Sequence, residues 1–345
     1  MSRSFIAILM AVVCFGFTAG IFLQPVPYDP NTPVSSVLMA LGADAPEHYI
    51  GTTDMEKLGL GKDIVITGST YLPDGSQSQR VSEHFVCVDC HNILPEAPFA
   101  DVNDPESRLS YAMETNLPYL PGSTLYGITN RTSWFNGDHE KKYGKELIAP
   151  TRNDLREAIQ LCSKECSTGR HLEDWELEAV LHYLNGLELK MRDLNLSEEE
   201  LESIGANGQS DEQKAQNIRL LRSKYIQGYP ATLVKEKPKK ERGMGEEGDL
   251  DRGKYIYEKS CLHCHSPEKT VTDRTVFGTG EDQKDLKWLA SYFKKSNGGS
   301  IYWITRHGTE SKDHIPQYMP IYSKEKLSDS QIEDLAMYIL TESRK

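Results

Sequence analysis

Two stretches of the same form decide the fold expected for this chain: Cys87-Val88-Asp89-Cys90-His91 and Cys261-Leu262-His263-Cys264-His265. In each stretch two residues separate the cysteines, and a histidine directly follows the second cysteine. This spacing lets two thiols add across the vinyl groups of one haem while the histidine becomes an axial ligand of the iron. We therefore predict two covalently attached haem c groups, the first bound by Cys87, Cys90 and His91 and the second by Cys261, Cys264 and His265.

Two other kinds of site use a pair of cysteines with this spacing. Half of a zinc site has it, and so does a thioredoxin-like redox pair. A zinc site would need its ligands in compact clusters, and a redox pair has no use for a histidine after the second cysteine in both copies. Covalent haem attachment explains both stretches better.

The length and charge of the chain limit its organisation and its partners. Its 345 residues suffice for two ordinary domains with a linker, which gives one motif to each domain. With 39 basic and 51 acidic residues the net charge is -12. This charge makes nucleic acid and anionic lipid poor partners and favours redox proteins with basic docking patches, although it could equally serve solubility alone.

The first residues predict export across a membrane. An apolar run from Phe5 to Leu23 follows a short start that contains Arg3. We expect an uncleaved membrane anchor in residues 1–24, with a cleaved signal segment as the alternative and Cys14 as a weak lipidation candidate. In either case Arg3 stays on the cytoplasmic side. The remainder is then expected on the periplasmic side of a bacterial inner membrane, in agreement with haem c, which is attached outside the cytoplasm.

The remaining sequence predicts an all-α protein with two haem domains. Prolines and few periodic apolar positions indicate an extended tether over residues 25–60, and a charged, partly helical linker without a binding site is expected over 196–248. The first haem domain would then cover 61–195 and the second 249–345. No strong helix is expected ahead of Cys87, and irregular packing is expected from 92 to 148. Apolar spacing predicts helices near residues 155–162, 174–187, 249–260, 300–307 and 328–340.

The second domain resembles a class I cytochrome c domain over nearly all of residues 249–345. The resemblance lies in a helix that runs into the motif at Cys261, a short helix from Ser300, the pair Met319-Pro320 and a closing helix with Ser328 and Gln331 in capping-box spacing. It implies a small all-α fold with Met319 as the distal iron ligand opposite His265. A thioether ligand raises the potential, and an iron with both axial positions filled is suited to pass electrons. A purely structural role for Met319 is the alternative, with His307 and His314 as spare candidates.

The first domain resembles the haem domains of thiosulfate dehydrogenases and of the haem subunit of the sulfur-oxidising cytochrome complex. The segment from Glu157 to Arg170 and the helix after it carry this resemblance, which spans roughly residues 60–190. It implies that Cys162 is a thiolate ligand of iron opposite His91. The chain departs from these families in its longer interval between His91 and Cys162 and in a second cysteine, Cys166.

The distal ligand of the first haem has several candidates. Cys162 comes first because helical spacing places it on the apolar face of its helix. Cys166 lies one turn later on about the same face. A disulfide between these two cysteines is the competing possibility in an oxidising compartment, although a helix would have to unwind to allow it. In that case Met113 becomes the next ligand candidate, followed by His139 and His171.

Three functions are compatible with these motifs. We expect a membrane-tethered dihaem cytochrome c that transfers electrons between redox partners outside the cytoplasm, alone or as a subunit of a respiratory or photosynthetic complex, and we favour an electron carrier over an enzyme. The first alternative is a thiosulfate dehydrogenase, in which a thiolate lowers the potential of the first haem and methionine raises that of the second. The second alternative is a dihaem cytochrome c peroxidase, which lacks a persuasive distal acid–base pair here.

Overall fold

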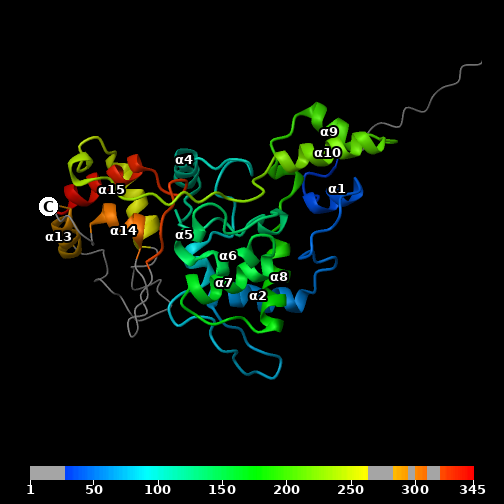
Figure 1. The fold of residues 1–345 in the computed structure, drawn as a ribbon, viewed down its shortest axis with the longest axis horizontal. Coiled ribbons are helices and arrows are strands. Elements are labelled where there is room, and N and C mark those ends of the chain that lie inside the picture. Colours follow the sequence, from blue (N-terminus) through cyan, green and yellow to red (C-terminus); the bar gives the residue numbers. More distant parts are fainter. Residues whose placement is uncertain (1–27, 263–282, 294–299, 309–318) are drawn as a thin grey trace, which may run out of the picture.

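A computed structural model describes residues 28–262, 283–293, 300–308 and 319–345 (Figure 1). Within these ranges the chain is helical and has no strand, only two isolated bridges, Pro33 with Lys190 and Tyr71 with Gln77. The all-α expectation is thereby confirmed for the described part. No helix in these ranges is long and apolar enough to cross a membrane, and the predicted anchor in residues 1–24 lies outside them.

The first group of helices surrounds the motif at Cys87. It consists of α2 (Met55–Thr67), α3 (Cys87–Cys90), α5 (His139–Tyr143), α6 (Lys145–Thr151), α7 (Leu155–Leu161) with a π-helical turn η2 (Cys162–Cys166), and α8 (Asp174–Gly186). The helix expected near 155–162 corresponds to α7, and that near 174–187 to α8. The presence of α2 contradicts the expectation that no strong helix precedes Cys87. Asp54 caps α2 by accepting hydrogen bonds from the backbone of Glu56 and Lys57, which helps this helix to form.

A glycine sets the crossing of α2 and α8. Figure 1 shows these two helices side by side, and Ile64 and Val65 of α2 share a buried cluster with Val180 and Leu184 of α8. A Cβ atom at Gly61 would lie 1.9 Å from the carbonyl oxygen of Ala179. The two backbones therefore approach more closely than any side chain at this position would allow.

The C-terminal helices also contain a close helix crossing at a glycine. They comprise α11 (Leu250–Ile256) with a π-helical turn η5 (Tyr257–Cys261), α13 (Gln283–Tyr292), α14 (Ile301–His307) and α15 (Asp329–Glu342). Helix α11 crosses α15 at Gly253, where a Cβ would lie 1.9 Å from the carbonyl oxygen of Asp334. The predicted capping box of α15 is confirmed, because Ser328 and Gln331 exchange backbone-to-side-chain hydrogen bonds of 3.0 and 3.1 Å.

The predicted tether, residues 25–60, differs from the expectation. Its described part, residues 28–60, contains α1 (Val34–Ala40) and the start of α2. Helix α1 packs with α9 (Glu198–Gly205) and α10 (Asp211–Ser223) in a third buried cluster, which includes Val37, Ile204 and Leu221. The apolar positions that a tether would expose are therefore buried against the helical part of the charged segment. Short 3-10 turns complete the described elements: η1 (Ile128–Asn130), η3 (Met191–Asp193) and η4 (Lys239–Glu241).

The stretch expected to pack irregularly, residues 92–148, contributes a helix to the C-terminal core. Helix α4 (Pro105–Thr115) and the following Tyr119 bury Leu109, Ala112 and the tyrosine ring in the same cluster as Ile332 and Leu335 of α15. The Tyr119 hydroxyl bonds the side-chain oxygen of Gln331 at 2.9 Å. Glycine, proline and aromatic residues in this stretch favoured an irregular prediction, and the apolar face of α4 is buried against helices distant in sequence.

We predict that Gly61→Ala and Gly253→Ala each destabilise the protein by about 1–3 kcal/mol, because the added methyl group overpacks a helix crossing. Gly59→Ala is the matched control on α2, since a Cβ there meets no atom within 4 Å. Alanine at that helical position should stabilise the protein by up to about 1 kcal/mol. Chemical denaturation of the three variants measures the effect. Equal stabilities for Gly59→Ala and Gly61→Ala would show that the crossing tolerates a side chain.

Candidate metal centre

The first motif forms a single helical turn at the wall of a cavity. Helix α3 places Cys87 and Cys90 on this turn, and the backbone N–H of His91 donates to the carbonyl of Cys87 at 3.0 Å. The Asp89 carboxylate accepts from the backbone N–H of Val86 at 2.8 Å, which closes the turn at its start. Both cysteines and the histidine thereby line the same space.

This space, the His91 cavity, has a volume of about 270 Å³ and lies between α2, α7 and α8. Most of its wall is apolar, as a porphyrin ring requires. The apolar residues of the wall include Ile64, Val65, Val81, Val86, Leu125, Ile128, Leu155, Ile159, Leu172, Val180 and Leu184.

His91 is held with one ring nitrogen available to a metal. Its Nδ1 lies 2.7 Å from the carbonyl oxygen of Ser123, which can only accept, so Nδ1 carries the proton and Nε2 keeps its lone pair. Burial lowers the pKa of His91, which favours this neutral form. Gly122 allows the ring to sit against the backbone, since a Cβ there would be 2.6 Å from the imidazole.

Cys162 faces the available nitrogen. It stands where α7 passes into η2, and its Sγ lies 4.0 Å from His91 Nε2. Zinc, a first-row transition metal, binds imidazole nitrogen at about 2.0 Å and thiolate sulfur at about 2.3 Å. With similar bond lengths, one metal ion between the two atoms needs a separation of about 4.3 Å. His91 and Cys162 are therefore spaced so that they would hold one haem iron between them. In the described part of the chain no three His, Cys, Asp or Glu side chains gather as a bare-ion site.

Cys166 lies in the same cavity and contacts Tyr143, whose hydroxyl is 3.3 Å from the Cys166 Sγ. None of the described cysteines forms a disulfide, so Cys162 and Cys166 are not bonded to each other. The Cys162 thiol donates a hydrogen bond to Cys166, and this bond together with burial raises the pKa of Cys162, whereas the same bond lowers the pKa of Cys166. Metal binding would therefore have to displace a proton from Cys162.

The other candidates for this site fall into two groups. His139 lines the cavity and has its Nδ1 2.7 Å from the carbonyl of Asn136. Met113 lies on α4 and is 37% exposed, and His171 is exposed; neither lines the His91 cavity. The structure thus brings Cys162, Cys166 and His139 to the first motif and leaves Met113 and His171 away from it.

Several residues that line the cavity were not predicted from the sequence. Tyr229, Pro230, Ala231 and Leu233 belong to the predicted linker yet line the cavity, which corrects the expectation of a linker without a site. An aromatic residue beside proline within a charged stretch was the one available hint. Arg131 and Lys326 also line the cavity, and Lys326 comes from the turn before α15. Only the fold brings residues so far apart in sequence together.

The second site is described in part. Cys261 ends η5, and burial raises its pKa to about 12. Met319 is partly buried, and its carbonyl lies so close to Gly308 that a Cβ there would be 2.2 Å from it. His307 bonds Glu236 at 2.6 Å and stacks on Trp303, which gives it a structural role. Cys264, His265 and His314 lie outside the described residues.

Residues 248–339 match the family model described as cytochrome C oxidase, cbb3-type, subunit III. This part of the chain is a c-type cytochrome domain. Covalently bound haem c and electron transfer follow for this cytochrome domain, and the match includes both Cys261 and Met319. No curated protein and no solved structure matches the chain.

We predict that Cys162→Ala abolishes the thiolate–histidine signal in the electron paramagnetic resonance spectrum of the oxidised protein. The reason is that Cys162 Sγ is the sulfur facing His91 Nε2. Cys166→Ala, the matched control from the same turn, should keep the signal. Loss of the signal in the control alone would assign the ligand to Cys166 instead.

Proposed function

We propose that this chain is a dihaem cytochrome c that transfers electrons between redox partners outside the cytoplasm. The observation that carries the proposal is the opposed pair His91 Nε2 and Cys162 Sγ, 4.0 Å apart in an apolar cavity that Cys87 and Cys90 also line. The same chain holds a c-type cytochrome domain with a second motif of identical spacing.

In the first site each residue has a separate task. Cys87 and Cys90 would hold the haem through thioether bonds, and His91 and Cys162 would fill the two axial positions. A haem in this site supplies reversible one-electron chemistry at iron. The Ser123 carbonyl fixes the orientation of His91, and the apolar wall excludes water. Two filled axial positions favour electron transfer over chemistry at the metal.

In the second site we propose Cys261, Cys264, His265 and Met319 as the corresponding residues. A thiolate at Cys162 lowers the potential of the first haem, whereas a thioether at Met319 raises that of the second. Electrons would then pass from the first site to the second. The peroxidase alternative is disfavoured because it needs an open coordination position, and Cys162 stands opposite His91.

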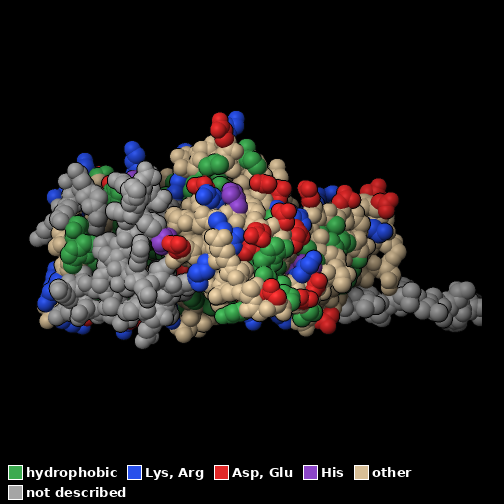
Figure 2. Space-filling view, turned by 90° about the horizontal axis from the view of Figure 1, so that it is seen from below, with side chains coloured by type: hydrophobic (Ala, Val, Ile, Leu, Met, Phe, Trp, Pro, Cys, Tyr) green, Lys and Arg blue, Asp and Glu red, His purple; other side chains and the backbone are tan. Residues whose placement is uncertain are grey.

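The setting we propose is the periplasmic side of a bacterial inner membrane, with residues 1–24 as the anchor. The net charge of -12 suits partners with basic docking patches. Figure 2 shows Asp and Glu side chains distributed over the described part of one face, interspersed with Lys and Arg. The family match names a subunit of a cytochrome oxidase, which supports membership of a respiratory complex for this chain.

We predict two haem c groups per chain. The double variant Cys87→Ala with Cys90→Ala should retain one haem, because the second motif is untouched, and the matched variant at Cys261 and Cys264 should retain the other. Haem content per protein, measured by absorbance of the denatured chain with pyridine, tests this. One haem in the wild-type protein would contradict the proposal.

A second candidate function is oxidation of thiosulfate or a related sulfur compound at the first site. The observation that favours it is the presence of Cys166 and Tyr143 beside Cys162 in one cavity, because an electron carrier needs no additional thiol and hydroxyl there.

If this second function is present, thiosulfate should reduce a partner dye through the pure protein, and Cys162→Ala should abolish the reaction. Cys261→Ala should leave the first site intact and serves as the control for binding there. Absence of thiosulfate-dependent reduction by the wild-type protein would retire this candidate and leave electron transfer alone.

A further inference from the structure

Four charged side chains are buried beside the His91 cavity, and two of them line it. This group, the Glu96 cluster, consists of Glu96, Arg108, Arg131 and Lys326, each no more than 8% exposed. The Glu96 carboxylate pairs with Lys326 at 3.0 Å and with Arg108 at 3.5 Å. Burial alone would raise the pKa of Glu96, but the two cations outweigh it and lower the pKa to about 2.

The positive charges in the Glu96 cluster exceed the negative ones. Three cations and one carboxylate, in their charged forms, leave an excess of two positive charges. Arg131 donates to the hydroxyl of Ser123 and to backbone carbonyls, and it has no carboxylate partner in the described part of the chain. Buried ions without counter-charges are costly, since desolvation is not repaid. Among the described residues, the cluster therefore has one carboxylate for three cations.

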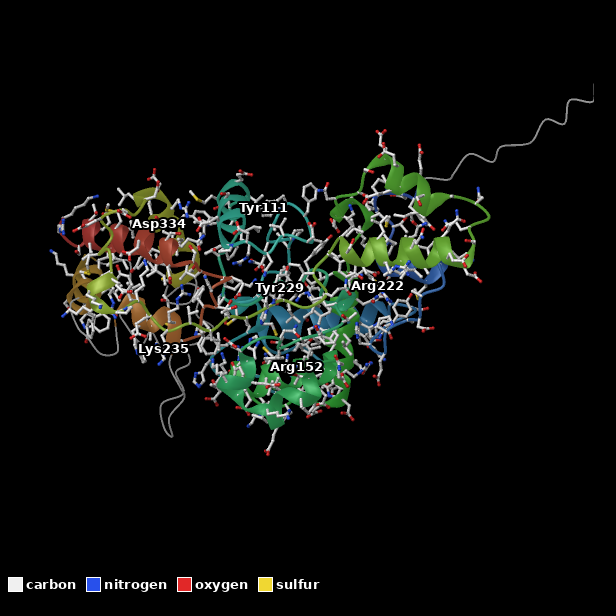
Figure 3. The ribbon with its side chains drawn as sticks, turned by 45° about the horizontal axis from the view of Figure 1, so that its top comes forward. Tyr111, Arg152, Arg222, Tyr229, Lys235 and Asp334 are labelled. Atoms are coloured by element: carbon white, nitrogen blue, oxygen red, sulfur yellow. The ribbon has the colours of Figure 1, made fainter. Side chains whose placement is uncertain are left out.

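The residues of this cluster that reach the cavity are cations. Arg131 and Lys326 both line the His91 cavity, and both lie over the ring of Tyr229, at 4.5 and 4.9 Å from its centroid. Figure 3 shows Tyr229 near the middle of the molecule, between the helix that carries Asp334 and the helix that carries Arg222. The excess charge is thus presented to the space in which the first motif would hold its haem.

A second observation, an unpaired hydrogen-bond donor, points to an anion in the same cavity. Trp134 lines the His91 cavity and is 7% exposed, and its indole N–H has no hydrogen-bond partner among the described residues. Buried N–H donors are normally paired. An anion in this cavity would satisfy both the donor and the cations.

We propose that Lys326, together with Arg131, binds the propionates of the first haem, so that the C-terminal domain completes the haem site of the N-terminal domain. The inference rests on the proposed presence of a haem at Cys87 and Cys90. Thioether bonds form at the vinyl groups and leave both propionates of a haem free, and in their ionised form their two negative charges match the excess of the Glu96 cluster. Burial lowers the pKa of Lys326 to about 7, and a carboxylate beside it would restore its charge.

This arrangement makes the second domain part of the first site. Lys326 lies in the turn before α15, within the segment that matches the cytochrome family model. Arg108 reinforces the connection by donating from α4 to the backbone carbonyl of Lys326 at 3.1 Å. Occupancy of the first site and docking of the C-terminal helices would therefore favour each other.

The test compares the midpoint potentials of both haems in the full-length holoprotein for the variants Lys326→Met and Glu96→Gln. Removal of a cation next to the propionates favours the ferric state, so Lys326→Met should lower the equilibrium constant for reduction of the first haem about tenfold, a shift of about 59 mV. Removal of the carboxylate should shift the same potential upwards. Lys324→Met is the matched control, because Lys324 is exposed two residues away.

Opposite shifts of the first potential, with the second potential constant, support the proposal. Lys326→Arg keeps the charge and should retain the wild-type potential even if Lys326→Met folds poorly. Unchanged potentials in a protein with two haems overturn the proposal alone, and so does a wild-type potential that depends on added phosphate, since a free ion would then be the partner. A wild-type chain with only one haem overturns both this inference and the proposed function.

Discussion

The close approach of two pairs of helices is the constraint on which this structure depends. In each half of the chain an early helix crosses the closing helix at a glycine, Gly61 against Ala179 and Gly253 against Asp334, with no room for a side chain. Because the backbones touch at one point, they diverge away from it. In the first half the diverging faces of α2 and α8 form part of the wall of the His91 cavity. The glycines thus determine where a flat apolar group can lie.

The chemistry of the first site follows from the residues on opposite sides of the His91 cavity. A backbone carbonyl fixes His91 on one side, and the π-helical turn η2 presents two thiols on the other. A widened helical turn alters the direction of the side chains within it, which suits a position where a side chain must reach a metal. The same form of turn, η5, leads to Cys261 in the second half. Both halves therefore use a local distortion of a helix at a sulfur atom.

Local signals explain what the sequence could predict. The first motif, the capping box at Ser328 and the apolar face that includes Cys162 are each encoded within a few residues, and the structure contains the corresponding elements. Helix α1 and the cavity residue Tyr229 escaped prediction because their burial depends on partners distant in sequence. Lys326 escaped for the same reason, since a lysine in a charged stretch is ordinarily on the surface. Periodicity within one segment carries no information about which distant segment covers it.

Helix α4 has a consequence for the order in which the protein is made. Its residues belong to the N-terminal half of the chain, yet Leu109 and Ala112 are buried in a cluster with residues of the C-terminal helices α11 and α15. During synthesis α4 emerges long before these helices, so its apolar face has no native cover during that interval. A C-terminal fragment that begins after the linker would have the opposite defect, an exposed groove where α4 belongs. The two halves of the chain are therefore joined through one buried cluster, to which both contribute apolar side chains.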